Sequence, residues 1–309
     1  MKLRKLLTLT MATVMTVSML AGCGSSSDNS TDTSDGSTTQ TESSWDASND
    51  ITVMSREDGS GTRGAFVELT GVEEKDADGN KVDNTTPDAI ISNSTEIVMT
   101  TVAGNEASIG YISLGSLNDT VKGVKVDDVE PTAENINNGT YQLSRPFNIV
   151  TKGSAAETSE AAQDFINFIM STDGQKVISD NGYIEVENSG AFSSNGASGK
   201  IVIAGSSSVT PVMEKLTEAY KAVNGNVEIE VQESDSTTGI NSTADGTCDI
   251  GMASRDLDES ETANGLESTA IAMDGIVVIV NNNNDVEGLT KDQINDIFRG
   301  NITDWSEVK

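Results

Sequence analysis

Residues 51–66 read ITVMSREDGSGTRGAF, and the fold is organised around this stretch. Its first four residues predict a strand, and an amphipathic run that predicts a helix begins at Thr62. The glycines between them let backbone N–H groups turn toward one point, and a helix N-terminus adds partial positive charge. The hydroxyls of Ser60 and Thr62 and the guanidinium of Arg56 complete a set of donors suited to a tetrahedral oxyanion. A tight turn with a Ser/Thr helix cap explains the same residues equally well.

A second stretch, residues 200–211, repeats this order of strand, Gly/Ser loop and helix with the sequence KIVIAGSSSVTP. Pro211 suits the first turn of the helix that follows. A third loop, residues 233–239, opens another short helix. Strands alternate with helices along the chain, which predicts an α/β sheet whose ligands bind at the carboxyl ends of the strands. All three loops fall at such ends, so two lobes are expected to grip one ligand between them.

Other segments give coarser expectations. The amphipathic pattern predicts a helix over residues 157–171, and the apolar run of residues 275–280 predicts a buried strand. Residues 72–86 are polar and acidic, which indicates an exposed excursion. Residues 187–199 are rich in Ser, Gly and Asn and are interpreted as a linker.

Composition excludes several classes of function. The net charge of −30 argues against nucleic acid as a partner, because binding a phosphate backbone needs clustered Lys and Arg. The chain has no His, which removes Ser-His-Asp triads and His-ligated metals. Its two cysteines, Cys23 and Cys248, lie far apart and cannot form a zinc cluster. No metal or cofactor is expected, and Cys248 is interpreted as a buried apolar residue.

Residues 1–23 have the pattern of a targeting segment. Lys2, Arg4 and Lys5 precede an apolar run over residues 6–20. The run ends in Leu-Ala-Gly-Cys23, which resembles the bacterial lipobox, so we expect acylation of Cys23 and a lipid anchor at the outer face of a membrane. An ordinary cleaved signal with a chance cysteine is the alternative. Residues 24–44 are Ser/Thr/Asp/Gly-rich and are expected to be a disordered tether.

Several motifs together resemble the phosphate-binding proteins of bacterial phosphate ABC importers, which are two-lobed proteins of the periplasmic-binding type II-like fold. The motifs lie in residues 55–66, 109–116, 143–147, 204–211, 249–255 and 274–278. The resemblance covers nearly everything from Trp45 to Lys309 except residues 187–199. It implies inorganic phosphate as ligand, permease subunits of an importer as partners, an extracytoplasmic location, no enzymatic activity and a monomer.

The order of the motifs differs from that of the family. There the Gly-Ser-Ser-Ser segment opens the mature protein, whereas here it follows residue 204, and the stretch Ile302–Val308 ends the chain. The chain therefore resembles a circular permutant in which residues 187–199 join the old termini. A gene fusion, an assembly artefact or a truncated tandem repeat would explain the order as well. The resemblance implies one lobe from residues 45–146 plus 275–309, another from 147–274, and a hinge near 143–150 and 274–280.

The resemblance also implies which residues bind phosphate. They come from both lobes: Ser207, Ser208, Ser236, Arg56, Ser60, Gly61 and Thr62. Asp58 resembles the carboxylate that orients the arginine. In the family an aspartate also accepts the proton that phosphate carries and repels sulfate. Ser254 stands at that position here, followed by Arg255, so Asp235 is the candidate acceptor. Asp235 is equally suited to cap a short helix.

Three classes of function remain open at this stage. The leading hypothesis is a surface lipoprotein that captures phosphate for an importer, with sulfate, molybdate or another oxyanion as alternative ligands. The second is a phosphate-sensing surface lipoprotein without a transport role. The third is a hydrolase that uses Ser60 or Ser208 as nucleophile, which the absence of His disfavours.

Overall fold

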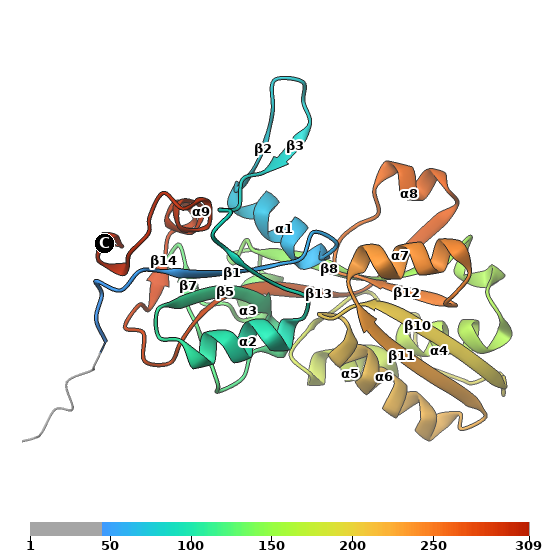
Figure 1. The fold of residues 1–309 in the computed structure, drawn as a ribbon. Helices are drawn as coiled ribbons and strands as arrows, with labels where there is room; N and C mark the ends of the chain where they lie inside the picture. The colour runs from blue at the N-terminus through green and yellow to red at the C-terminus, as the bar shows by residue number, and fades with distance from the viewer. Residues whose placement is uncertain (1–44, 309) are drawn as a thin grey trace, which may run out of the picture. The chain divides into compact units, whose positions relative to one another are not determined.

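The structure is a computed structural model that describes residues 45–308. Within these residues a ten-stranded mixed sheet forms the centre of the fold, and its main path runs in the order β11-β10-β12-β8-β13-β5-β1-β4 (Figure 1). The bounds of these strands are β1 Thr52–Arg56, β4 Ile90–Ser92, β5 Ser108–Ser113, β8 Ser144–Lys152, β10 Gly199–Ser206, β11 Val227–Ser234, β12 Ile250–Ala253 and β13 Leu266–Val280. The α/β class predicted from the sequence is confirmed.

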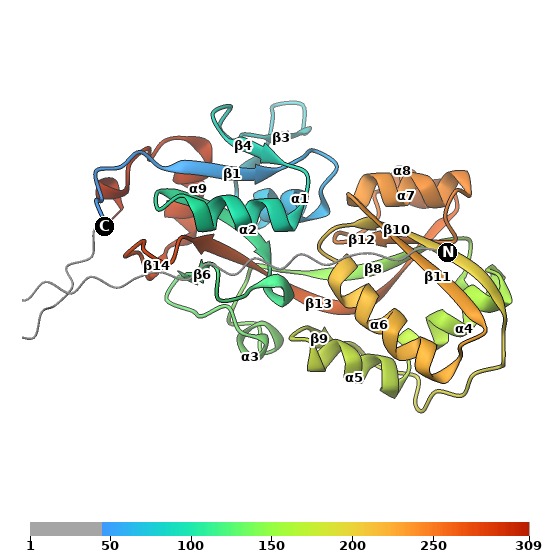
Figure 2. The same cartoon turned by 60° about the horizontal axis from the view of Figure 1, so that its bottom comes forward.

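Helices cover both faces of this sheet. Their bounds are α1 Gly61–Thr70, α2 Thr95–Gly104, α3 Ala133–Asn137, α4 Glu160–Ile169, α5 Thr172–Asp180, α6 Thr210–Val223, α7 Ser236–Asp245, α8 Glu259–Ala263 and α9 Lys291–Arg299. Short elements complete the chain: β2 Glu73–Lys75, β3 Lys81–Asp83, β6 Lys122–Gly123, β7 Lys125–Val126, β9 Ile184–Glu185, β14 Gly288–Leu289 and the 3-10 turns η1 Leu114–Ser116, η2 Ala155–Glu157 and η3 Trp305–Glu307. In Figure 2, α7 lies on one face of strands β10 and β12, and α4 and α6 lie on the other.

The buried apolar residues form four clusters. Two clusters come from residues 53–143 and 276–305, and the other two come from residues 147–272. We therefore call residues 45–146 with 275–308 lobe A, and residues 147–274 lobe B. Two strands join the lobes: β13 pairs with β8 over its first part and with β5, in lobe A, from Ile276 onward. The sheet is thus continuous between the lobes. Within the described residues, β8 and β13 are the long strands that run from one lobe into the other.

A buried ion pair lies where β8 and β13 pass between the lobes. Arg145 Nη2 donates to Asp274 Oδ2 over 3.2 Å, and Ser113 Oγ donates to Asp274 Oδ1 over 2.8 Å. Burial raises the pKa of Asp274 to about 6, although Arg145, Ser113 and two backbone N–H groups of η1 act against it. Burial likewise lowers the pKa of Arg145 to about 10. The surrounding packing keeps both charged groups buried and next to each other.

The two ends of the described chain lie side by side. Ile51 N donates to Thr303 O over 2.7 Å, and the rings of Trp45 and Trp305 meet edge to face at 5.9 Å. Trp305 Nε1 also donates to Ala107 O over 3.0 Å, which ties the last turn to the start of β5. The segment before β1 and the segment after α9 thus form one local unit.

The structure differs from two of the sequence predictions and adds detail to a third. The predicted helix over 157–171 is shorter, because Ser171 starts a separate helix, α5, by accepting a hydrogen bond from Gly174 N over 3.2 Å. The strand predicted over 275–280 begins at Leu266, since residues 266–274 pair with β8 even though several of them are polar and exposed. The exposed excursion predicted at 72–86 is confirmed, and it contains a hairpin, β2–β3, which stands away from the sheet in Figure 1.

Two further expectations concern membranes and cysteines. Among residues 45–308, none of the helices combines the length and the apolar character needed to cross a membrane. Cys248 is buried with a reduced thiol, as predicted. The predicted targeting segment, Cys23 and the predicted tether lie outside the described residues.

Residues 187–199 are mostly exposed and are fastened to lobe B at a few points. The carboxylate of Asp164 on α4 accepts hydrogen bonds from Asn195 N (2.9 Å) and Ser194 Oγ (2.8 Å) of this segment. It also accepts from Tyr220 Oη (2.8 Å) and Asn224 Nδ2 (3.1 Å) on and after α6. Burial alone would raise the pKa of Asp164, but these hydrogen bonds outweigh it and hold the pKa below its ordinary value of 3.8. Asp164 thus joins the segment to two helices.

Asp164→Asn is expected to lower the free energy of unfolding by about 2–3 kcal/mol at neutral pH, because an amide turns a donor toward groups that themselves donate. Because the pKa of Asp164 is depressed on folding, its contribution is present above pH 3.8 and is lost as the pH falls below that value. Urea unfolding of both proteins between about pH 3 and 7 measures this difference. Asp180→Asn, at an exposed pair with Lys176, is the control and is expected to change stability by less than about 0.5 kcal/mol. A loss that is equal for both variants would contradict the assignment.

Candidate functional site

Among the described residues, the N-termini of α1, α2, α6 and α7 bring polar side chains into one buried cluster. The first two helices belong to lobe A and the last two to lobe B. Each helix begins at the end of a strand or of the loop after it, and the first backbone N–H groups of a helix have no carbonyl partner within that helix. We call the following residues, each at most 6% exposed, the donor cluster: Arg56, Ser60, Thr62, Thr95, Ser206, Ser207, Ser208, Ser236 and Ser254.

Hydrogen bonds of the donor cluster cross between the lobes. Thr62 Oγ1 lies 2.8 Å from Ser208 Oγ, and Arg56 Nη2 donates to Ser207 Oγ over 3.0 Å. Thr95 Oγ1 lies 3.2 Å from Ser207 Oγ and 3.3 Å from Ser208 Oγ. The structure therefore shows the lobes in contact through these side chains.

Ser254 occupies the middle of the cluster. It accepts from Ser206 Oγ over 3.1 Å and lies 3.3 Å from Ser236 Oγ and 3.5 Å from Thr62 Oγ1. Its own N–H donates to Ser236 Oγ over 3.0 Å. Gly61 passes so close that a Cβ there would lie 2.8 Å from Ser254 Oγ and 2.6 Å from Ser236 Oγ. A glycine is required at position 61 for this approach of the two lobes.

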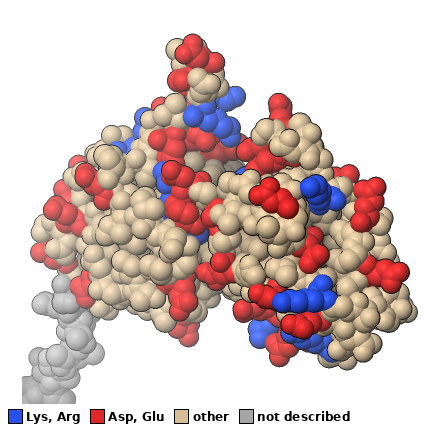
Figure 3. Space-filling view, turned by 45° about the vertical axis from the view of Figure 1, so that its right-hand side comes forward, with Lys and Arg blue, Asp and Glu red and all other residues tan. Residues whose placement is uncertain are grey.

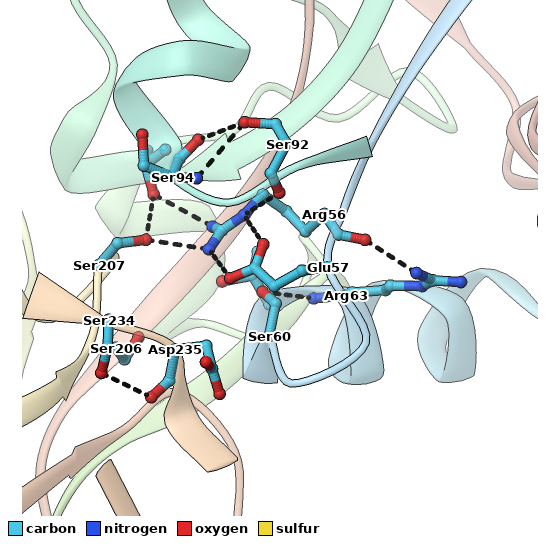
Figure 4. A network of polar contacts seen from close by, with 12 residues as sticks. Arg56, Glu57, Ser60, Arg63, Ser92, Ser94, Ser206, Ser207, Ser234 and Asp235 are labelled. Atoms are coloured by element: carbon cyan, nitrogen blue, oxygen red, sulfur yellow. Dashed lines mark hydrogen bonds and ion pairs between the residues drawn. The ribbon is translucent and has the colours of Figure 1, made fainter. Parts of the chain in front are cut away.

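Arg56 is held in place by a carboxylate and by lobe A hydroxyl and carbonyl groups. Glu57 accepts from Arg56 Nε over 2.8 Å and from Nη2 over 2.7 Å, and Figure 4 shows the guanidinium between Glu57 and Ser207. Arg56 Nη1 donates to Thr95 Oγ1 over 3.3 Å, and Nε to Ser92 O over 3.3 Å. The N–H of Arg56 donates to Tyr111 Oη over 3.1 Å, so β5 fixes the end of β1.

The predicted role of Asp58 is wrong. Its side chain is 96% exposed and contacts Arg63 rather than Arg56, with Arg63 Nη1 donating to Asp58 Oδ1 over 2.6 Å. The physical reason is the turn at the end of β1, because Glu57 is placed beside Arg56 while Asp58 points to the other side of the loop. Glu57 is therefore the carboxylate that orients Arg56.

Asp235 is the N-cap of α7. Its Oδ1 accepts from Thr238 N over 2.8 Å and its Oδ2 from Thr238 Oγ1 over 2.6 Å, so the capping interpretation is the one that the structure shows. The carboxylate lies at the edge of the cluster, against Gly59 of lobe A, where a Cβ would come within 2.3 Å of Oδ1. Arg255 also turns away from the cluster, since it pairs with Glu261 at 2.8 Å.

Most of the predicted site residues thus meet in one place, while Asp58 does not. Sequence reasoning missed Thr95, Ser206 and Glu57. Thr95 had a usable signal, because residues 89–95 repeat the pattern of an apolar strand, a short polar loop and a helix start that was used for the other loops. Glu57 had no usable sequence signal. Two adjacent acidic residues follow Arg56, and the geometry of the turn determines which of them contacts it.

The comparisons with known proteins agree on one family. The sequence matches the model described as a PBP superfamily domain over residues 34–173 and 190–309. Phosphate-binding protein PstS 2 of Streptococcus agalactiae is 49% identical over 309 residues, which are 100% of this chain and 99% of that protein. The phosphate-binding protein PstS of Bacillus subtilis is 32% identical over 139 residues, 44% of this chain and 42% of that protein.

A solved structure supports the same assignment. The crystal structure of a phosphate ABC transporter phosphate-binding protein from Streptococcus pneumoniae is similar to this structure with a TM-score of 0.66 and 46% sequence identity, over 84% of this chain and 100% of that one. The sequence matches and this likeness cover both lobes. The chain therefore belongs to the PBP superfamily and, within it, to the family of the PstS phosphate-binding proteins.

Proposed function

We propose that this protein captures inorganic phosphate between its two lobes and delivers it to an ABC importer on the outer side of the membrane. One observation carries the proposal: nine buried donor-cluster side chains from both lobes meet at four helix N-termini within the described residues. A tetrahedral anion with four oxygens needs many donors arranged around it, and this cluster supplies hydroxyls, backbone N–H groups and one guanidinium.

Local donors are needed because the protein as a whole is acidic. The net charge is −30, and Figure 3 shows acidic side chains spread over the face in view, with fewer basic ones. The long-range field therefore repels an anion. Glu57 also neutralises much of the charge of Arg56. Binding then rests on short hydrogen bonds in a site closed to water, where each bond is stronger than it is at the surface.

Release and capture follow from the connection between the lobes. Because β8 and β13 join them, bending of these strands near residues 143–150 and 274–280 would separate lobe A donors from lobe B donors. Bound phosphate would bridge the two sets and hold the lobes closed. A permease that opens the lobes would therefore separate the two sets of donors that bridge the anion, and the anion would be released.

We further propose that the protein is a monomeric lipoprotein that performs no chemistry. The lipobox-like sequence before Cys23 supports a lipid anchor, with residues 24–44 as tether. In the described contacts, Ser208 Oγ meets the hydroxyls of Thr62 and Thr95, and Ser60 Oγ accepts from Arg63 N, so neither serine contacts a general base. A sensing role without transport uses the same site and would be distinguished by the absence of permease and ATPase genes nearby.

The order of segments supports a circular permutation. The Streptococcus agalactiae relative matches from end to end, so its segments have the order of this chain, whereas the Bacillus subtilis relative matches over less than half of either protein. A sequence alignment keeps the order of segments, so a permuted chain is expected to align with an unpermuted relative over only one contiguous part. The neighbouring ends of the described chain, at Ile51 and Thr303, and the mostly exposed segment 187–199 fit such a rearrangement.

Arg56→Gln is expected to weaken phosphate binding by about 30-fold, roughly 2 kcal/mol, because it removes a charged donor that faces the cluster. Calorimetric titration of the full chain with inorganic phosphate measures the change. Arg299→Gln is the matched control, because Arg299 pairs with Glu74 of the hairpin and does not belong to the donor cluster. This variant is expected to leave the affinity for phosphate within about twofold of the wild type. Equal affinities of the Arg56 variant and the wild type would exclude Arg56 from the site.

Thr95→Val is expected to weaken phosphate binding by about tenfold, near 1.4 kcal/mol, because it removes a hydroxyl while keeping the shape of the side chain. Ser94, which accepts from Ile97 N over 3.2 Å, still caps α2, so the helix is retained. Thr95→Ser keeps the hydroxyl and is expected to bind within about threefold of the wild type. If Thr95→Val bound as tightly as Thr95→Ser, Thr95 would be a packing residue only.

A further inference from the structure

We propose that Tyr183 of lobe B and Gly115 of lobe A form a second closing contact between the lobes, which stabilises the closed form and so raises the affinity for the anion. Neither residue belongs to the donor cluster, so both act as positioning residues, through the angle between the lobes. The inference rests on the proposed function, because it concerns the closure of the lobes that is proposed to trap phosphate.

The ring of Tyr183 lies directly on the backbone of Gly115. A Cβ atom added at Gly115 would overlap with Tyr183 Cζ and Cε1 and would lie 2.5 Å from Oη. Carbon atoms in contact are about 3.5–4.0 Å apart, so no side chain fits in this arrangement. The φ angle of Gly115 is not positive, so backbone strain does not account for the glycine. The ring of Tyr183 is the reason that position 115 has no side chain.

Both partners are held within their own lobes. Tyr183 is 3% exposed, its ring lies 5.5 Å from that of Phe147 between centroids, and its N–H donates to Ile178 O over 3.3 Å. Gly115 is the middle residue of η1, and its N–H donates to the carboxylate of Asp274. The ring is therefore enclosed by lobe B and cannot swing into solvent, so a side chain at position 115 would push the lobes apart.

The contact spans the part of β13 that connects the lobes. The short strand β9, which directly follows Tyr183, pairs with β13 at residues 272–273, whereas β5, which precedes η1, pairs with β13 from Ile276 onward. Bending of β13 between these two pairings would turn the ring relative to Gly115. Opening of the lobes would lift the ring from the glycine, and closure would return it while the donor cluster comes together.

The test compares the full wild-type chain with Gly115→Ala, Tyr183→Leu and the double variant. Tyr183→Leu removes the three ring atoms that a Cβ at position 115 would meet. In calorimetric titrations with inorganic phosphate, Gly115→Ala is expected to weaken binding at least about tenfold when Tyr183 is present, but less than about threefold in the Tyr183→Leu background. Gly104→Ala is the control, because an added Cβ there has no neighbour within 4 Å outside its helix, and it is expected to bind within about twofold of the wild type.

Small-angle X-ray scattering separates closure from folding. Saturating phosphate is expected to reduce the radius of gyration of the wild type and of the double variant, and to reduce it less in Gly115→Ala. Urea unfolding checks that each variant folds. An unchanged affinity of Gly115→Ala, or an equal loss in both backgrounds, would overturn the proposal while leaving the proposed function intact. Wild-type protein that gives neither heat nor contraction with phosphate would contradict the proposed function and this inference with it.

A second pair of variants decides the question if Gly115→Ala does not fold. Tyr183→Phe keeps the ring on Gly115 and is expected to bind phosphate within about twofold of the wild type, whereas Tyr183→Leu is expected to bind about fivefold more weakly. Equal affinities of the Phe and Leu variants for phosphate would show that the ring does not stabilise the closed form, and would overturn the proposal.

Discussion

The structure depends on a balance between a strongly acidic protein and a buried cluster of hydroxyls with one guanidinium, Arg56. An anion that approaches a chain of net charge −30 gains nothing from the overall field. The favourable terms are local: helix N-termini from two lobes, hydroxyls that rotate to suit the ligand, and Arg56, whose orientation Glu57 fixes. Since neither lobe has the whole donor cluster, closure of the lobes would complete the proposed site.

The same balance explains the arrangement of the strands between the lobes. If such a pocket lay within one rigid lobe, that lobe would have to be disrupted to expose its buried polar groups and load the anion. In the proposed mechanism, two lobes joined by β8 and β13 solve this, because bending of these strands would expose the donors without disturbing either apolar core. The pair of Arg145 and Asp274 lies at this connection, buried and hydrogen-bonded, so the polar interior extends from the site toward the strands that would bend.

The sequence predicted the fold, and most of the residues that it nominated for the site lie together in the donor cluster; its failures have physical reasons. The Gly/Ser loops were predictable because strand, turn and helix start leave a local pattern, and Thr95 belongs to a fourth copy of that pattern. The choice between Glu57 and Asp58 was not predictable, since it depends on which side of a turn each carboxylate faces. The length of β13 could not be predicted either. Its first part is a strand because it pairs with β8, and the polar residues 267–269 do not have the apolar pattern of a buried strand.

The most direct test of the central claim is a crystal structure of the full chain grown with inorganic phosphate. The account predicts a tetrahedral density feature between the lobes, with oxygens within hydrogen-bonding distance of Arg56, Thr62, Ser208 and Ser236. It also predicts that Ser254, in the middle of the donor cluster, lies beside the anion. Phosphate bound elsewhere, or donor-cluster residues of lobes A and B turned away from one another around an empty cleft at saturating phosphate, would contradict the account.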